Sequence, residues 1–372
     1  MKRFWNIYEK IYDLDNLREA HRQARKDKQL YREVKMVNAS EDYFLKKIQK
    51  LLKEKKYHIT EKDYSVSIIR DKTKSRELRK LRYYPHRIIQ WAIMLQIEKY
   101  FMQVFTDFTC ASVKGRWMTH VMELMDRYMR DKEWTAYCLK LDISKFYPNV
   151  NHRILKKLLR KKFKDKDLLN ILDMIIDSFP WKRWLPIWSY LSQFLANFYL
   201  SYCDHWLKEV VRCKYVVRYM DDIVILWSNK KWLRYVFRRL KWYLWWVLNL
   251  KIKDNYQIFP TAIRWVDYVW YRYFYGYKLL RKRTAEKFKK KAVHLRIKQD
   301  MWIVRNFRER CAMNSYVWWM CHCNSFRLFE KYVDPIIPSM NRYYFYEIGN
   351  KKKNKLKKYY KKLINKKYKS RK

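Results

Sequence analysis

The sequence lacks long apolar runs and paired cysteines. No stretch of about 18 consecutive apolar residues occurs, which excludes a membrane-spanning helix. The first residues, MKRFWNIYEKIYD, contain no apolar core of the kind that a signal peptide needs. The seven cysteines are scattered and odd in number, which is typical of reduced thiols. We therefore expect a cytoplasmic protein that does not enter a membrane.

Acidic residues are few beside basic ones. Lys and Arg number 86 and Asp and Glu number 36, giving a net charge of +50 in 372 residues. A charge of this size favours a polyanionic partner, and nucleic acid is the first candidate. Aromatic residues, 19% of the chain, are interleaved with the charge and suit base stacking. Solubility alone, or an anionic membrane surface, is the alternative explanation.

Glycine is almost missing. The chain has 3 glycines, although an average composition of about 7% would predict roughly 26. Tryptophan, in contrast, occurs 18 times. The two counts together come close to an ordinary glycine content.

Hydrophobic periodicity predicts a mixture of helices and strands. Apolar residues recur at helical spacing over 16–34, 40–57, 87–105, 152–163, 165–179, 190–211, 232–248 and from about 283 onward. A hairpin is expected from 64–71 into the basic run 72–87, a pair of strands within 214–227, and strands at 137–147, 250–259 and 266–274. We expect an α+β fold without internal repeats.

Three carboxylates carry the clearest chemical signal. Asp221 and Asp222 lie between two apolar segments, at the expected turn within 214–227. Adjacent carboxylates in such a place repel each other unless a cation lies between them. Asp142 ends the expected strand CLKLD. Three carboxylates at strand ends can bind two Mg²⁺ ions, which would activate an attacking hydroxyl and stabilise a leaving pyrophosphate. A solvated turn is the alternative for an isolated Asp-Asp pair.

Five segments of the sequence resemble the motifs of one polymerase family, in the same order along the chain. The segments LKLDISKFYPNV, LPIWSYLSQFLANFYL, RYMDDIVIL and LNLKIKDN resemble palm motifs A to D of reverse transcriptases, and KSRELRKLRYYPHRIIQWAI resembles their bacterial fingers motif. The resemblance covers residues 70 to 275 approximately. It implies a right-hand polymerase fold, with a palm built on an antiparallel sheet. The implied divisions are N-terminal helices and fingers at 1–135, palm at 136–278 with finger-side helices at about 151–180, helical thumb at 279–348, and a Lys-rich tail at 349–372.

The resemblance also implies roles at the site. Asp142, Asp221 and Asp222 would bind two Mg²⁺ ions, with Mn²⁺ as the alternative ion. The backbone carbonyl of Ile143 would complete one metal site. Lys253 would protonate pyrophosphate, although an ordinary lysine is an equal alternative in so basic a chain.

Further implied roles concern the nucleotide. Lys74 and Arg76 would hold the incoming triphosphate by charge-assisted hydrogen bonds, with Arg82 and Arg87 as competing candidates. The remaining implied contacts are Tyr147 as the aromatic gate that rejects a 2′-hydroxyl, Gln193 beside the nascent base pair, and Met220 at the primer end.

The function implied by the resemblance is RNA-directed DNA polymerisation, with template RNA, an RNA/DNA duplex and deoxynucleotides as partners. The Ser192-Gln193 pair resembles the motif of diversity-generating retroelement enzymes, which implies error-prone copying and a small basic accessory protein. A retron-type or antiphage-defence reverse transcriptase is one alternative. A catalytically silent nucleic-acid-binding relative is another.

Tryptophans stand where the resembled family has glycine. These positions are Trp5, Trp117, Trp184, Trp188, Trp265 and Trp270. Glycine adopts positive φ angles at little cost and lets the backbone approach a neighbouring group closely, whereas tryptophan does neither easily. We therefore hypothesise that UGA codons read as glycine by some uncultured bacteria have been translated here as tryptophan. A genuinely Trp-rich or decayed enzyme is the rival hypothesis.

Overall fold

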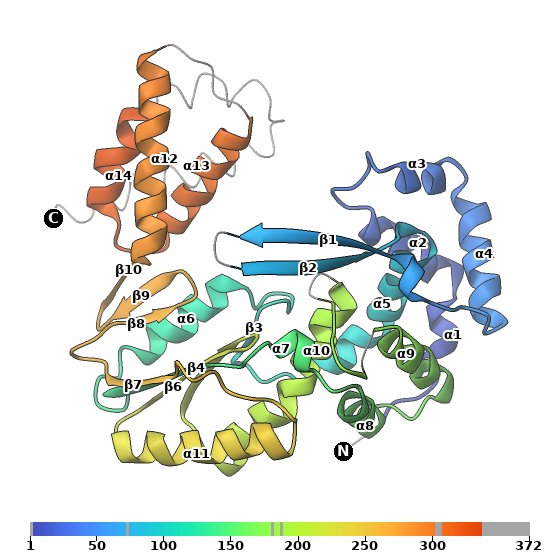
Figure 1. Cartoon of the computed structure of the whole chain (residues 1–372), viewed down its shortest axis with the longest axis horizontal. Coiled ribbons are helices and arrows are strands. Elements are labelled where there is room, and N and C mark those ends of the chain that lie inside the picture. The colour runs from blue at the N-terminus through green and yellow to red at the C-terminus, as the bar shows by residue number, and fades with distance from the viewer. Residues whose placement is uncertain (1–2, 72–73, 180–181, 187–188, 302–306, 337–372) are drawn as a thin grey trace. The chain divides into compact units, whose positions relative to one another are not determined.

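The computed structural model describes residues 3–71, 74–179, 182–186, 189–301 and 307–336 (Figure 1). The chain falls into two compact units. The first comprises Met1–Leu124 and Tyr137–Phe259, and the second comprises Met125–Ala136 and Pro260–Lys372. The expected tail at 349–372 lies outside the described residues, and the division into fingers, palm and thumb stays a prediction.

A five-stranded sheet forms the centre of the first unit. Its strands are β3 (Thr109–Cys110), β4 (Tyr137–Asp142), β5 (Tyr215–Tyr219), β6 (Asp222–Trp227) and β7 (Gln257–Pro260), in the order β3-β5-β6-β4-β7. β5 and β6 are antiparallel neighbours, as are β6 and β4, whereas β3 runs parallel to β5. The inner residues of β5 and β6 are buried on both faces, which explains their continuous apolar runs. The predicted pair of strands within 214–227 is confirmed.

Two long helices pack on this sheet. Leu233, Val236, Leu240 and Leu244 recur at helical spacing in α11 (Lys230–Trp246) and are buried, and the helix packs against β4 and β6 (Figure 1). The helix α10 (Tyr190–His205) contacts β3 and α5 (Ile88–Met102), and it is buried nearly all round. Its lack of a polar face is therefore a consequence of its central place.

The remaining elements of the first unit are helices and a hairpin. The helices are α1 (Tyr8–Ile11), α2 (Leu14–Ala24), α3 (Arg32–Ala39), α4 (Glu41–Lys53), α6 (Met118–Tyr128, which crosses the boundary between the units), α7 (Phe146–Asn149), α8 (His152–Lys162) and α9 (Lys166–Asp177). Side chains of Asn151 and Asp165 cap the first turns of α8 and α9. The predicted hairpin is confirmed: β1 (Tyr64–Asp71) pairs with β2 (Lys74–Leu81), and its tip at 72–73 lies outside the described residues.

Three sequence predictions of single elements are wrong. The expected helix at 16–34 is broken between α2 and α3, where Asp27 has a φ of +59°. The expected strand at 250–259 contains only β7 and an isolated bridge between Ile252 and Ile143. The expected strand at 266–274 is a hairpin that turns at residues 269 and 270. A turn with Val and Trp at its corner carries none of the Gly, Asn or Asp signals that predict one.

The second unit combines a small sheet with helices. The strands β8 (Val266–Tyr268), β9 (Tyr271–Phe274) and β10 (Tyr277–Leu280) form an antiparallel sheet in the order β10-β9-β8. The helix α12 (Lys282–Asp300) packs against α13 (Phe307–Met320) and α14 (Phe326–Tyr332) through buried Phe288 and Leu295. Across the described ranges of both units, no helix is long and apolar enough to cross a bilayer.

Candidate active site

The sheet brings the three candidate carboxylates to one place. Asp142 is the last residue of β4, and Asp222 is the first residue of β6. The two residues lie directly opposite each other in the antiparallel register. Asp221 precedes Asp222 in the two-residue turn between β5 and β6. Residues that are far apart in the sequence therefore converge at one edge of the sheet, as the strand pattern predicted.

The electrostatics of this carboxylate cluster favour a cation. Burial, and then the negative charge of Asp142, raise the pKa of Asp221 to about 6. Within the described part of the chain, the buried Oδ1 of Asp142 has no hydrogen-bond partner. A buried carboxylate oxygen without a donor is uncommon, and crowded carboxylates are stabilised by a divalent ion. Among the described residues, no group of three or more His, Cys, Asp or Glu side chains is arranged as a ready metal site. The unpartnered oxygen and the raised pKa of Asp221 favour Mg²⁺ here, and its binding stays a prediction.

Lys253 lies beside the same cluster. Its Nζ forms an ion pair with Oδ2 of Asp142. Its backbone N–H donates to the carbonyl of Asp142 at 2.9 Å, and the backbone N–H of Ser144 donates to the carbonyl of Lys251 at 2.7 Å. The ammonium group thus compensates one carboxylate directly. The structure brings Lys253 to the site, and its role as a proton donor stays a prediction.

Tyr147 and Met220 meet at the turn that carries Asp221. The Tyr147 hydroxyl donates to Sδ of Met220 at 3.7 Å. Burial, and then the charge of Asp221, raise the pKa of the Tyr147 phenol. Met220 has a φ of +56°, in the left-handed region that costs a non-glycine residue free energy. Both predicted nucleotide-contacting residues therefore lie next to the carboxylate cluster.

Other predicted nucleotide-binding residues lie on separate elements. Lys74 and Arg76 belong to β2, opposite Asp71 and Ile69 in the hairpin register, and their side chains lie outside what the structure describes. Gln193 is half-buried in the first turn of α10. Their roles at the nucleotide stay predictions.

The hairpin does reach the segment before α10. The guanidinium of Arg79, in β2, lies 5.2 Å from the ring centroid of Trp184. Trp184 has a φ of +95°. Its N–H donates to the carbonyl of Val150 at 3.1 Å, and its carbonyl contacts Nε2 of His152 at 3.0 Å. Backbone contacts therefore hold this position in a conformation that favours glycine.

Comparison with protein families decides the family. Residues 69–255, half of the chain, match the family described as "Reverse transcriptase (RNA-dependent DNA polymerase)". The chain belongs to this family. The matched range contains Asp142, Asp221, Asp222 and Lys253, and it begins within the β1–β2 hairpin. The mixed helices and sheet are those of a right-hand polymerase fold. No curated protein matches the chain.

Solved structures that the chain resembles include telomerases. The telomerase from Candida albicans, in complex with a fragment of telomeric RNA, matches with a TM-score of 0.47 and 10% identity over 75% of this chain and 56% of that chain. The apo telomerase from Candida tropicalis matches with a TM-score of 0.47 and 12% identity over 74% of this chain and 57% of that one. The chain thus spans a little over half the length of these structures.

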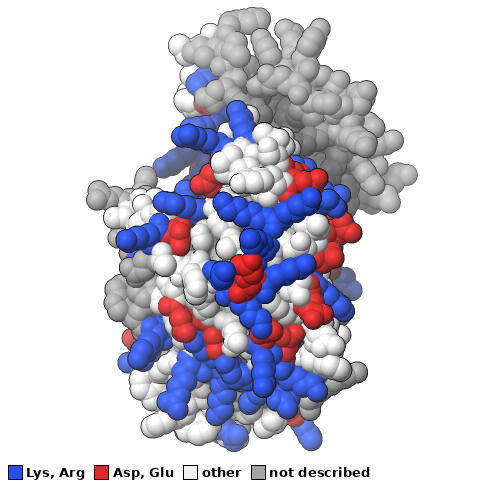
Figure 2. Space-filling model, turned by 90° about the vertical axis from the view of Figure 1, so that its right-hand side faces the viewer, with Lys and Arg blue, Asp and Glu red and all other residues white. Residues whose placement is uncertain are grey.

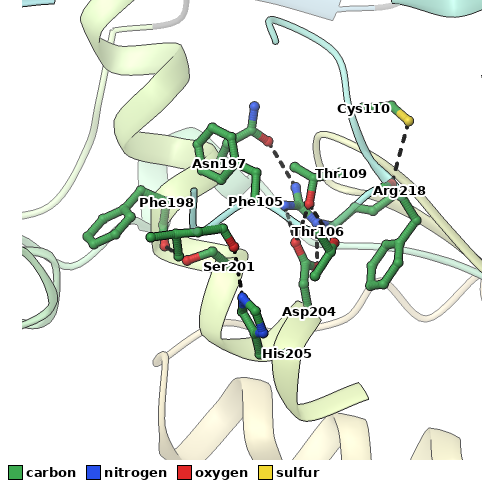
Figure 3. Close-up of polar contacts among 12 residues, drawn as sticks. Phe105, Thr106, Thr109, Cys110, Asn197, Phe198, Ser201, Asp204, His205 and Arg218 are labelled. Carbon is green, nitrogen blue, oxygen red and sulfur yellow. Dashed lines mark hydrogen bonds and ion pairs between the residues drawn. The ribbon is translucent and has the colours of Figure 1, made fainter. Parts of the chain in front are cut away.

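The sequence motifs did not identify a buried ion pair behind the reverse transcriptase carboxylates. Arg218 in β5 pairs with Asp204 in α10, and each side chain is only 1% exposed (Figure 3). A signal for it was present, because Arg218 interrupts an otherwise apolar strand. A charge at such a position requires a buried partner, and nothing in the sequence pattern indicates which residue that is.

Proposed function

We propose that the chain is an RNA-directed DNA polymerase that copies an RNA template into cDNA by two-metal nucleotidyl transfer. The observation that carries this proposal is that Asp142 and Asp222 lie opposite each other in the register of β4 and β6, beside Asp221, in a chain of the reverse transcriptase family. The carboxylates of these residues, with the carbonyl of Ile143, would hold two Mg²⁺ ions, or Mn²⁺ as the alternative. Bound ions would lower the pKa of the primer hydroxyl and stabilise pyrophosphate.

Residues around the carboxylates would select and orient the substrate. Tyr147, which reaches Met220, would exclude a ribonucleotide 2′-hydroxyl, and Met220 would contact the primer end. Gln193 would lie at the nascent base pair, and Lys74 and Arg76 on the hairpin would bind the triphosphate of the deoxynucleotide. Lys253 is near enough to Asp142 to serve as a proton donor to pyrophosphate.

Template RNA and the RNA/DNA duplex are the proposed polyanionic partners. Figure 2 shows one face of the molecule on which Lys and Arg side chains outnumber Asp and Glu and gather in groups. This surface accords with the net charge of +50. Such a field strengthens backbone binding in a sequence-independent, salt-sensitive way.

A diversity-generating retroelement is the setting that we propose. The Ser192-Gln193 pair supports it, and the setting adds error-prone copying and a small basic accessory protein as a partner. A template and variable repeat that differ mainly at adenines, close to the gene, would support this setting. Their absence would favour a retron-type or antiphage-defence enzyme.

We also propose that many tryptophans of the written sequence are glycines in the native protein. The φ angles of +95° at Trp184 and +74° at Trp270 support this, as do the exposed fractions of 61% and 62% for Trp5 and Trp117. Trp188 lies outside the described residues. UGA codons at these positions, and glycine in peptides from the native host, are expected. UGG codons would contradict the proposal.

Primer extension on poly(rA)·oligo(dT) tests the polymerase directly. The chain with glycine at positions 184, 188, 265 and 270 would be assayed beside the written chain. The Asp221→Ala, Asp222→Ala double variant is expected to lose extension. A matched control is Asp15→Ala with Asp42→Ala, because these exposed carboxylates pair only with Arg18 in the described structure. Equal extension by the parent and the Asp221, Asp222 double variant would refute the two-metal proposal.

A further inference from the structure

The buried pair behind the turn is part of a larger polar cluster. Arg218 donates from Nε to Oδ1 of Asp204 at 2.7 Å and from Nη2 to Oδ2 at 2.5 Å, which is the two-point geometry of a guanidinium on a carboxylate (Figure 3). The Thr109 hydroxyl donates to the same Oδ2 at 2.8 Å. Asp204 is therefore held from β3 and β5 at once, inside a core from which water is excluded.

The other terminal nitrogen of Arg218 is directed at the backbone of the turn. Nη1 donates to the carbonyl of Met220 at 2.9 Å and to Oδ1 of Asn197 at 3.0 Å. Asn197, also in α10, donates in turn to the carbonyl of Ala111 at 3.0 Å. A single side chain thereby connects the β5–β6 turn to the central helix and to the end of β3.

The bonded carbonyl belongs to the peptide that joins Met220 to Asp221. On the far side of Asp221, its own carbonyl accepts from the N–H of Ile143 at 3.1 Å. The backbone of Asp221 is therefore fixed from both sides, by Arg218 through Met220 and by Ile143, the residue after β4. Because Met220 has a positive φ, a hydrogen bond to its carbonyl also offsets the cost of that conformation.

We propose that Arg218, oriented by Asp204, is a positioning residue: it holds the Met220 carbonyl and thereby orients the carboxylate of Asp221. This inference rests on the proposed two-metal site. A buried ion pair is poor at adding stability, since well-packed apolar residues often serve as well. An apolar residue in β5 could fill the same space but could not donate to a backbone carbonyl. The donor to the turn is the feature that requires arginine.

Arg218→Lys tests the proposal, because lysine keeps the charge and loses the forked geometry. Hydrogen exchange of the metal-free protein is the first measurement, on peptides that cover residues 215 to 227. We expect exchange at the turn to rise about 10-fold while far-ultraviolet circular dichroism stays unchanged. Mn²⁺ binding followed by electron paramagnetic resonance should weaken, and kcat for dTTP should fall about 100-fold with KM changed less than about threefold.

Arg160→Lys is the matched control. Arg160 also makes a two-point contact with an aspartate, Asp173, but at the exposed surface of α8 and α9. This variant should leave exchange at residues 215 to 227, Mn²⁺ affinity and kcat at parental values. Parental exchange and Mn²⁺ affinity in folded Arg218→Lys would overturn the proposal.

Thr109→Val serves if Arg218→Lys does not fold. It removes the hydrogen bond to Asp204, together with one to the Thr106 hydroxyl, and keeps every charge and nearly the same volume. A smaller rise of exchange at the turn, about twofold to threefold, is expected, and parental exchange would overturn the proposal. The exchange measurement requires no catalysis. A parent chain without polymerase activity would therefore refute the proposed function and leave the positioning of the turn open to this test.

Discussion

Two hairpins in this molecule turn with non-glycine residues at positive φ, and they differ in what surrounds the turn. In the β5–β6 turn, Met220 has a φ of +56°, and a buried arginine donates to its carbonyl. In the β8–β9 turn, Val269 and Trp270 have φ angles of +33° and +74°, and the Trp270 side chain is 42% exposed. The first is a strained residue within a candidate site. At the second, the Trp270 carbonyl accepts from the backbone N–H of Arg281 at 2.8 Å and the Trp270 ring stacks on Trp319 at 5.2 Å, whereas the donor at the first is a buried side chain.

The β8–β9 turn has two central residues with positive φ, as a type I′ hairpin does. Such a turn needs positive φ at both central residues and strongly prefers glycine at the second, which is the position of Trp270. The contrast shows that strain alone does not identify function. At Met220 the strain accompanies converging carboxylates and a dedicated donor, whereas at Trp270 it accompanies a residue of the wrong type for its backbone.

The largest expected effect is a difference in kcat when one aspartate in each hairpin is replaced. Asp221→Asn in the first turn should lower kcat about 1,000-fold, since about 4 kcal/mol of charge stabilisation by a bound metal would be lost. Asp267→Asn in β8 removes a carboxylate that pairs with Arg281 and should change kcat less than about threefold. Steady-state primer extension measures both. A similar loss of kcat in Asp221→Asn and Asp267→Asn would contradict the expectation that only the first turn takes part in catalysis.

The second effect concerns pH and the metal-free protein. Since the pKa of Asp221 is raised to about 6 in the folded state, that state binds the proton more tightly than the unfolded chain does. The free energy of unfolding should therefore fall as the pH rises from about 4 to about 6, by about 2 kcal/mol. Urea denaturation with a chelator measures this change.

Asp221→Asn should flatten this pH profile, because the asparagine does not titrate. Asp267→Asn, in the other hairpin, should keep the parental slope. A parental slope in Asp221→Asn would show that the pH dependence arises elsewhere.

The third effect tests the strained tryptophan. Trp270→Gly should raise the free energy of unfolding by about 1 kcal/mol, because glycine adopts the positive φ without strain and this gain should exceed the loss of the half-exposed stack on Trp319. Trp206→Gly is the control, since Trp206 has a φ of −62° and stacks on Tyr243 at 4.8 Å. It should lose about 3 kcal/mol. Equal destabilisation by both substitutions would argue for a native tryptophan at 270.

The smallest effect concerns the contact between Tyr147 and Met220. Tyr147→Phe removes a hydroxyl that donates to sulfur at 3.7 Å, which is a weak interaction. The kcat for deoxynucleotide insertion should change less than about twofold to threefold, about 0.5 kcal/mol. Single-turnover kinetics would measure it. A loss of about 100-fold would show that the phenol itself takes part in the reaction at the first turn.

From the sequence alone, we could predict which three aspartates lie at strand ends, the strands that carry them and the family of the chain. These features depend on local pattern, since apolar runs flank Asp221 and Asp222 and a family match extends over residues 69–255. Its composition, with 3 glycines and 18 tryptophans, also supports the proposal that glycines are written here as tryptophans. The β8–β9 turn could not be predicted, because its residues carry no turn signal.

The residues that contact and support the site are visible only in the folded structure. It placed Lys253 on Asp142, Tyr147 on Met220, and Asp204 on Arg218. The pairing of Arg218 with Asp204 depends on how α10 packs against the sheet, and sequence spacing encodes none of the three pairs. The physical reason is that a buried charge requires a partner, whereas the identity of the partner is fixed only when the core is packed.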